Sequence, residues 1–242
     1  MTTTAASTPT VESHDDGSGG GIPHRKLILG TIAVVLVGAV ATWLVAFSSV
    51  FGVHTVDVRG VHVLTADQVR SAAKIANGTP LVRLDTDGIR SRVEALPDVA
   101  SAKVTTSFPS TVIITISERT AIGVVKGGSG YLLVDRTGEQ FRTVAARPAG
   151  LPLFVVPQGA AGRPTGSAVA TVAGALNARL RGRIDSIQAI SPQAITLLFS
   201  NGRVVRWGNA DRSAAKARIL PILLHRPGTQ IDVTDPSQPF TR

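Results

Sequence analysis

The chain contains no cysteine and few aromatic residues: its 242 residues include seven Phe, two Trp and one Tyr. The absence of cysteine excludes disulfide bridges and cysteine-based catalysis. The shortage of aromatics argues against nucleic-acid binding, which usually combines exposed rings with basic residues. The formal net charge is nevertheless +9. A basic balance of this kind also suits an anionic membrane or a cell-wall polymer.

The first residues lack any apolar cluster. The stretch MTTTAASTPTVESHDDGSGGGIP consists mainly of Thr, Ser, Gly and Asp. Such a segment cannot bury enough apolar surface to offset the entropy lost on ordering. We therefore expect residues 1–24 to form a disordered tail.

Residues 27–52 carry no charged side chain. A helix over residues 27–47 is long enough to cross a hydrocarbon core of about 30 Å. Arg25 and Lys26 precede it, so the positive-inside rule predicts a cytoplasmic N-terminus. A cleaved signal peptide is the alternative, but AFSSVFG is a poor cleavage site. We expect residues 25–50 to form one uncleaved transmembrane helix, in contact with lipid, that leaves the rest of the chain extracytoplasmic.

The segment after residue 50 has the pattern of a small α+β layer. Thr65 and Gln68 have the spacing of a capping box, and the helix that they begin should stop at Asn77-Gly78. Asp85 can cap a second helix, which Pro97 ends. The expected elements are a strand over 53–60, helices within 64–78 and 84–99, and strands over 99–108 and 110–118.

From Thr120 onward, short strands alternate with turns and helices. The strand-like runs are AIGVV, YLLVD, EQFRTV, RIDSIQAI, QAITLLF and RVVRWG, and GSAVATVAGALNARL has helical periodicity. Asp211 is expected to cap a further helix in which Lys216 and Arg218 point away from the apolar face. Pro221 should kink or split that helix.

One short strand ends this series. It covers Gln230, Ile231, Asp232, Val233 and Thr234, with Pro227-Gly228 before it and Pro236 after it. The pattern predicts a mixed, β-rich α+β domain over 120–235 and a short tail over 236–242. With no later strand to pair with, the strand over 230–234 is expected to form an open edge.

No catalytic motif is present in the sequence. It has no nucleophile elbow, no phosphate-binding loop and no dinucleotide fingerprint. The five histidines lack the i, i+4 partners of a helical metal site. We expect no catalytic, cofactor-binding or metal site and no small-molecule substrate. Arg179, Arg181 and Arg183 should complement a helix dipole, with contact to an anionic partner as the lesser alternative.

Several strings resemble a known family. VDVRGVHVLTADQVRSAA and LPDVASAKVTTSFPSTVIITISERT resemble the POTRA domain of the bacterial cell-division family FtsQ/DivIB. YLLVDRTG and ITLLFSNGRVVRWGNADRSAAKARILPILL resemble the β-domain of that family. The resemblance implies a transmembrane helix, a POTRA domain over 51–119 and an FtsQ-type β-domain over 120–235.

The resemblance also implies a function. Members of this family are single-pass proteins of the cytoplasmic membrane that gather at the division septum. They are non-enzymatic scaffolds that bind FtsB/DivIC-like and FtsL-like partners, and the partner adds a strand beside the last strand of the β-domain. The matching positions here are residues 230–234.

Two other functions remain open from the sequence. POTRA modules also occur in envelope transport and assembly factors, but those combine tandem repeats with a C-terminal barrel. An exported cell-wall enzyme would need a catalytic constellation that the sequence does not show.

Overall fold

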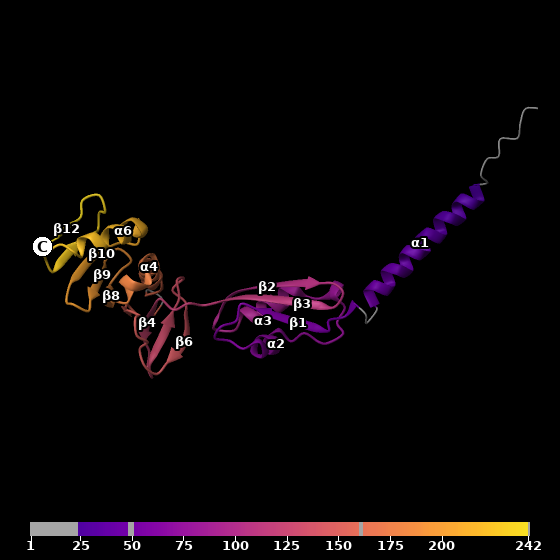
Figure 1. Ribbon diagram of the computed structural model, residues 1–242, viewed down its shortest axis with the longest axis horizontal. Helices are drawn as coiled ribbons and strands as arrows, with labels where there is room; N and C mark the ends of the chain where they lie inside the picture. Colours follow the sequence, from indigo (N-terminus) through magenta and orange to yellow (C-terminus); the bar gives the residue numbers. More distant parts are fainter. Residues whose placement is uncertain (1–23, 48–50, 160–161, 242) are drawn as a thin grey trace, which may run out of the picture.

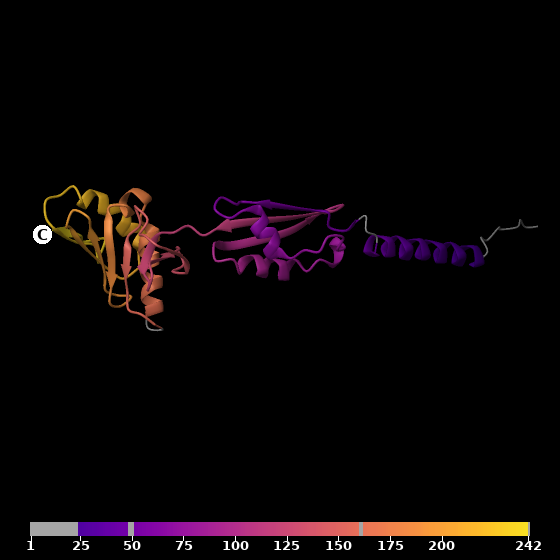
Figure 2. The ribbon, with the colours of Figure 1, turned by 90° about the horizontal axis from the view of Figure 1, so that it is seen from below.

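The structure is a computed structural model that describes residues 24–47, 51–159 and 162–241. Its parts follow one another along a long axis: helix α1 (His24–Phe47), a unit with a three-stranded sheet, and a unit with a nine-stranded sheet (Figure 1). The same succession is visible after a turn of 90° (Figure 2). Residues 1–23, most of the expected disordered tail, lie outside the described residues.

Helix α1 covers most of the segment for which a transmembrane helix is expected. Its apolar side chains Leu36 and Val37 are exposed. Within the part of the chain that the structure describes, no helix is both long and apolar enough to qualify as a membrane span. Arg25 and Lys26 fall in the first turn of α1, and their side chains lie outside the described part.

The three-stranded unit has the expected β-α-α-β-β order. Its sheet order is β1-β3-β2, with β1 parallel and β2 antiparallel to β3. Val69 and Ile89 from the two helices pack with Val112 and Ile114 of β3, so both helices cover one face of the sheet. The elements are β1 (Thr55–Arg59), α2 (Ala66–Ala73), the 3-10 turn η2 (Leu81–Arg83), α3 (Thr86–Glu94), β2 (Val99–Ser107) and β3 (Thr111–Glu118).

The starts of both helices agree with the sequence. The Thr65 hydroxyl accepts a hydrogen bond from the Gln68 backbone N–H, and the Gln68 side chain accepts one from the Thr65 N–H, at 3.2 and 2.8 Å. Asp85 accepts a hydrogen bond from the Gly88 N–H at 2.9 Å. These contacts satisfy backbone donors that have no partner inside the helix.

The expected end of α2 at Asn77-Gly78 is wrong. The helix ends at Ala73, because Lys74 takes a left-handed conformation with φ of 49°. The guanidinium of Arg92 in α3 donates two hydrogen bonds to the Ala73 carbonyl, which caps this end. The early turn lets Ile75 pack against the core.

The second unit is built on a sheet with the order β12-β11-β10-β9-β8-β7-β4-β5-β6. Strand β7 was not expected, yet it joins the two halves of the sheet because it pairs in parallel with both β4 and β8. The strands are β4 (Gly123–Lys126), β5 (Tyr131–Val134), β6 (Gln140–Val144), β7 (Leu153–Val155), β8 (Ile184–Ala189), β9 (Ile195–Phe199), β10 (Val204–Gly208), β11 (Gln230–Asp232) and β12 (Phe240–Thr241).

Three helices accompany this sheet: α4 (Gly162–Ala175), α5 (Ala178–Arg181) and α6 (Ser213–Leu223). Helices α4 and α6 contact each other and share one core cluster with the sheet, so they cover the same face. Arg181 donates a hydrogen bond to the Leu176 carbonyl at 3.0 Å. This contact places a cation at the C-terminal end of α4, as the sequence suggests.

Two ion pairs link the two units. Arg119, directly after β3, pairs with buried Asp135 after β5. Asp98, just before β2, pairs with Arg142 of β6, whose Nε donates at 2.7 Å. The first unit is therefore tied to the β6 side of the large sheet.

Candidate functional site

Strand β11 contains three of the five residues, 230–234, at which the family resemblance implies partner binding, and we call these five residues the docking edge after that prediction. It runs parallel to β10, with Gln230 opposite Val204 and Asp232 opposite Arg206. The side chain of Ile231 is 2% exposed, and that of Val233, just after the strand, is fully buried. Burial of such side chains contributes about 1.5–3 kcal/mol each, so the core holds β11 in place.

The backbone groups of β11 alternate between its two neighbours. Val204 N–H donates to Thr229 C=O, and Val233 N–H donates to Arg206 C=O, at 2.9 and 3.0 Å. Odd-numbered residues here therefore direct their backbone groups toward β10. Because successive residues of a strand point these groups in opposite directions, those of Gln230 and Asp232 face away from β10.

The outer side of β11 is covered within the same chain. Strand β12 pairs antiparallel with it, with Thr241 opposite Ile231 and Phe240 opposite Asp232. The expectation that no later strand pairs with residues 230–234 is therefore wrong. Two residues after Pro239 carry no pattern that predicts a strand, which is why the sequence did not reveal this pairing.

A buried polar cluster supports the docking edge from β10 and α6. Lys216 is 1% exposed, and its ammonium donates to Trp207 C=O, Asn209 C=O and Asn209 Oδ1 at 2.9, 3.0 and 3.2 Å. Trp207 Nε1 donates to the Ser213 hydroxyl at 3.1 Å. The expectation that Lys216 points away from the core is wrong. Its three donors have partners, which makes its burial tolerable.

The electrostatic state of Lys216 follows from this environment. Burial lowers its pKa below the ordinary value, and the nearby positive charge of Arg212 lowers it further. The carboxylates of Asp211, Asp232 and Asp235 act in the opposite direction. The signal that sequence reasoning missed is the spacing, because Lys216 lies four residues before buried Leu220 on the same helix face.

The start of α6 also differs from expectation. The N-cap is Arg212, in a left-handed conformation with φ of 53°, and no side-chain cap bond is present there. Asp211 instead accepts a hydrogen bond from the Asn209 side chain. Helix α6 continues through Pro221 as one helix, so of the two expected effects, a kink or a split, the split does not occur.

Thr234, the last of the expected docking residues, lies against Gly208 at the end of β10. A Cβ atom added to Gly208 would approach the Thr234 side chain to 2.9 Å, and Gly208 has a positive φ of 78°. Only glycine meets both conditions easily. The contact keeps the end of the docking edge close to β10.

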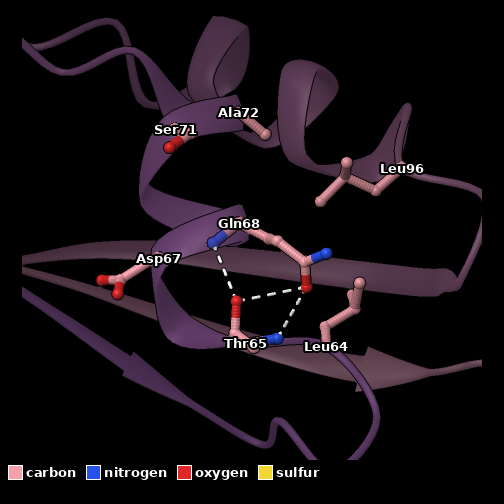
Figure 3. A pocket seen from close by; sticks show the side chains of 7 residues that line it. All are labelled: Leu64, Thr65, Asp67, Gln68, Ser71, Ala72 and Leu96. Atoms are coloured by element: carbon pink, nitrogen blue, oxygen red, sulfur yellow. Dashed lines mark hydrogen bonds between the residues drawn. The ribbon is translucent and has the colours of Figure 1, made fainter.

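The three-stranded unit has an open groove of about 540 Å³ beside α2. Figure 3 shows Leu64 and Leu96 on either side of Gln68, with Asp67 pointing away. The Thr65 hydroxyl and the Gln68 amide oxygen, which line this groove, are used for hydrogen bonds within the helix start. Leu64, Ala72 and Leu96 give the groove an apolar part beside these polar groups.

No metal centre is visible in the described ranges. Within residues 24–47, 51–159 and 162–241, no group of three or more histidine, aspartate or glutamate side chains gathers closely enough to hold a metal ion. The described histidines lie apart in the chain: His54 bonds to Gly52 C=O, His225 bonds to Pro221 C=O, and His62 lies in the loop before α2.

Comparison with known proteins connects both units to cell division. The sequence matches the family "POTRA domain, FtsQ-type" over residues 51–119 and the family "Cell division protein FtsQ/DivIB, C-terminal" over residues 123–235. The second match favours the division function over the transport alternative.

Two individual FtsQ proteins agree with this. Cell division protein FtsQ of Mycobacterium tuberculosis (strain ATCC 25618 / H37Rv) is 35% identical over 217 residues, covering 90% of this chain and 69% of that protein. FtsQ of Streptomyces bingchenggensis (strain BCW-1) is 34% identical over 230 residues, which cover 90% of this chain and 86% of that protein. The major extracytoplasmic domain of DivIB from Geobacillus stearothermophilus (trans isomer) covers 44% of this chain and 92% of that structure, with 19% identity and a TM-score of 0.35.

The two family matches together cover more than half of the chain, and they occur in the order in which the two sheets follow each other. The relatives match across both units at above 30% identity. The chain belongs to the FtsQ/DivIB family of bacterial cell-division proteins.

Proposed function

We propose that this protein is a non-enzymatic scaffold of the division machinery. Residues 27–47 anchor it in the cytoplasmic membrane, the N-terminus is cytoplasmic, and the units from residue 51 onward stand outside at the division septum. The end of the large sheet binds FtsB/DivIC-like and FtsL-like partners by strand addition. The protein thereby links early and late division proteins.

One observation carries the docking part of this proposal. The β6 edge of the large sheet is tied to the first unit by Arg142 and Asp98, whereas the opposite end of the sheet is β11 with the two-residue strand β12. Figure 1 places β12 at the end of the molecule far from α1. A sheet end with such a short last strand offers backbone donors and acceptors to an extended partner segment.

Gln230→Pro tests strand addition at this edge. Proline removes the Gln230 N–H, which faces away from β10, while the bonds of Thr229 and Val233 to β10 remain. We expect co-purification of the full chain with the FtsB/DivIC-like protein of the same organism to fall by at least about tenfold, the effect of one unmade buried hydrogen bond.

Gln230→Ala is the matched control, because it shortens the same exposed side chain and keeps the N–H. It should co-purify as the unaltered chain does. Equal co-purification of the proline and alanine variants would refute docking by strand addition at β11. Ile231 is a poorer choice for this test, since its side chain is buried and its backbone faces β10.

Membrane anchorage is tested separately. Because the chain has no cysteine, a single introduced cysteine is its only thiol and can be labelled selectively. Single variants Ser7→Cys and Ser237→Cys are exposed in whole cells to a maleimide that does not cross membranes. The anchor proposal, which rests on the charge-free stretch 27–52 after Arg25 and Lys26, predicts labelling at position 237 and none at position 7 before lysis. Labelling at both positions, or at neither, would contradict the proposed topology.

A further inference from the structure

Strand β12 is a very short strand in a position that a longer strand could occupy. It consists of Phe240 and Thr241 and pairs with Asp232 and Ile231. Because the backbone groups of Asp232 face away from β10, Asp232 and Phe240 form the hydrogen-bonded pair of this ladder, and Ile231 and Thr241 form the non-hydrogen-bonded pair. Within the described residues, the ladder between β11 and β12 therefore contains one hydrogen-bonded pair.

The side chains of β12 fit their positions poorly. Phe240 lies opposite Asp232, which pairs with exposed Arg206 at 3.7 Å, and Phe240 is itself 50% exposed. Thr241 lies opposite Ile231, whose side chain is buried in the core. Residues directly opposite each other share a face, so a polar residue stands where an apolar one would bury more surface.

The connection that returns the chain to β11 is held by exposed contacts. This return segment covers residues 235–239, between the docking edge and β12. Asp235 accepts hydrogen bonds from the Ser237 N–H and hydroxyl at 3.0 and 2.7 Å, and it pairs with Arg212 at 3.3 Å. More than half of each of the Asp235 and Arg212 side chains is exposed, so this ion pair holds the segment weakly.

We propose that β12 is an internal occupant of the docking edge, which an incoming partner strand displaces. This inference rests on the proposed function. The partner contributes an extended segment of three or more residues that bonds to the outward backbone groups of Gln230 and Asp232. It carries an apolar, β-branched residue opposite Ile231, where this chain has Thr241.

Displacement has a measurable consequence for binding. While β12 occupies the edge, only the fraction of molecules with an open edge can bind, and the apparent affinity falls by that fraction. Removing β12 should therefore strengthen binding. The gain is about tenfold if the edge is open about a tenth of the time.

The test uses two stop variants of the full chain in mild detergent. One ends after Gln238 and lacks β12, and the control ends after Thr241 and keeps it. Each is titrated with two probes by fluorescence anisotropy. The first is the labelled extracytoplasmic segment of the FtsB/DivIC-like protein of the same organism, and the second is a labelled peptide of residues 234–242 of this chain.

The expected result is about tenfold tighter binding of the partner segment to the chain that ends after Gln238. The peptide should bind that chain, compete with the partner segment and leave the control unbound. Equal or weaker binding of the partner segment after loss of β12 would overturn the occupant role while leaving docking intact.

If the partner segment binds neither chain, the proposed docking fails. Binding of the peptide of residues 234–242 then still tests whether β12 is exchangeable. Peptide binding confined to the chain that ends after Gln238 would still support an exchangeable internal strand. Equal affinity of the peptide for the two chains would overturn the proposal that β12 is exchangeable.

Discussion

At the scale of single residues, Lys216 shows that a charged side chain can belong to the core. Its ammonium donates to Trp207 and Asn209 and lies 5.9 Å from the centre of the Trp207 ring, a distance suited to a cation–π contact. Among the described residues no carboxylate forms an ion pair with this ammonium, and oriented carbonyl groups stabilise its charge. The carbonyl of Trp207 belongs to β10 and those of Asn209 follow directly after it, next to the docking edge.

Lys216→Met tests the structural part played by this charge. Methionine keeps most of the chain length but leaves the carbonyl oxygens of Trp207 and Asn209 without their donor. We expect the free energy of unfolding to fall by about 2 kcal/mol, measured by urea unfolding with Trp207 fluorescence.

The exposed residue Lys103 supplies the control for this measurement. Lys103→Met makes the same chemical change on the surface of β2 and should alter stability by no more than about 0.5 kcal/mol. If the two variants unfold at the same urea concentration, the buried ammonium does not support the β10–α6 contact.

At the scale of elements, the carboxylate of Glu118 connects the end of β3 to the loop that precedes α2. It accepts hydrogen bonds from the N–H groups of His62, Val63 and Leu64 at 2.9–3.0 Å. Burial alone would raise the pKa of Glu118, but these three backbone donors lower it more. The acidic residue of the string ISERT thus organises a loop more than 50 residues earlier in the chain.

The sign of the pH dependence follows from this shift. Because the pKa of Glu118 is lower in the folded chain, its carboxylate stabilises the fold at neutral pH, and this contribution is lost as the pH falls through the lowered pKa. Glu118→Gln should cost about 1 kcal/mol at pH 7, similar to the loss of a helix cap. Urea unfolding of both chains at several pH values should show this gap closing toward acid pH. A gap that stays constant with pH would contradict the role of the carboxylate.

The elements that the sequence predicts well are those with local patterns. The capping box at Thr65 and the buried alternation of Val112, Ile114 and Ile116 depend on residues close together in the chain, and the structure confirms both. Strand β7 was not predicted from the sequence, because it is only three residues long, lies between Pro152 and Pro157, and pairs with strands that are distant in the sequence. The pairing of β12 with β11 was not predicted either, because a strand of two residues leaves no periodic pattern in the sequence.

At the scale of the whole molecule, the chain places its docking edge far from α1. The three-stranded unit lies between α1 and the large sheet in both views (Figures 1 and 2). The ion pairs of Arg119 with Asp135 and of Asp98 with Arg142 join the two units at the β6 side. A partner that binds at β11 would therefore approach the opposite edge of the sheet, clear of the first unit.

The central claim is that this chain supports division through the outer edge of β11. The most direct measurement replaces the native protein with Gln230→Pro in living cells and scores septa by microscopy, with Gln230→Ala as control and equal membrane levels of both. The account predicts filaments without septa for the proline variant and normal division for the alanine variant. Normal septa in cells that contain only the Gln230→Pro protein would contradict the claim.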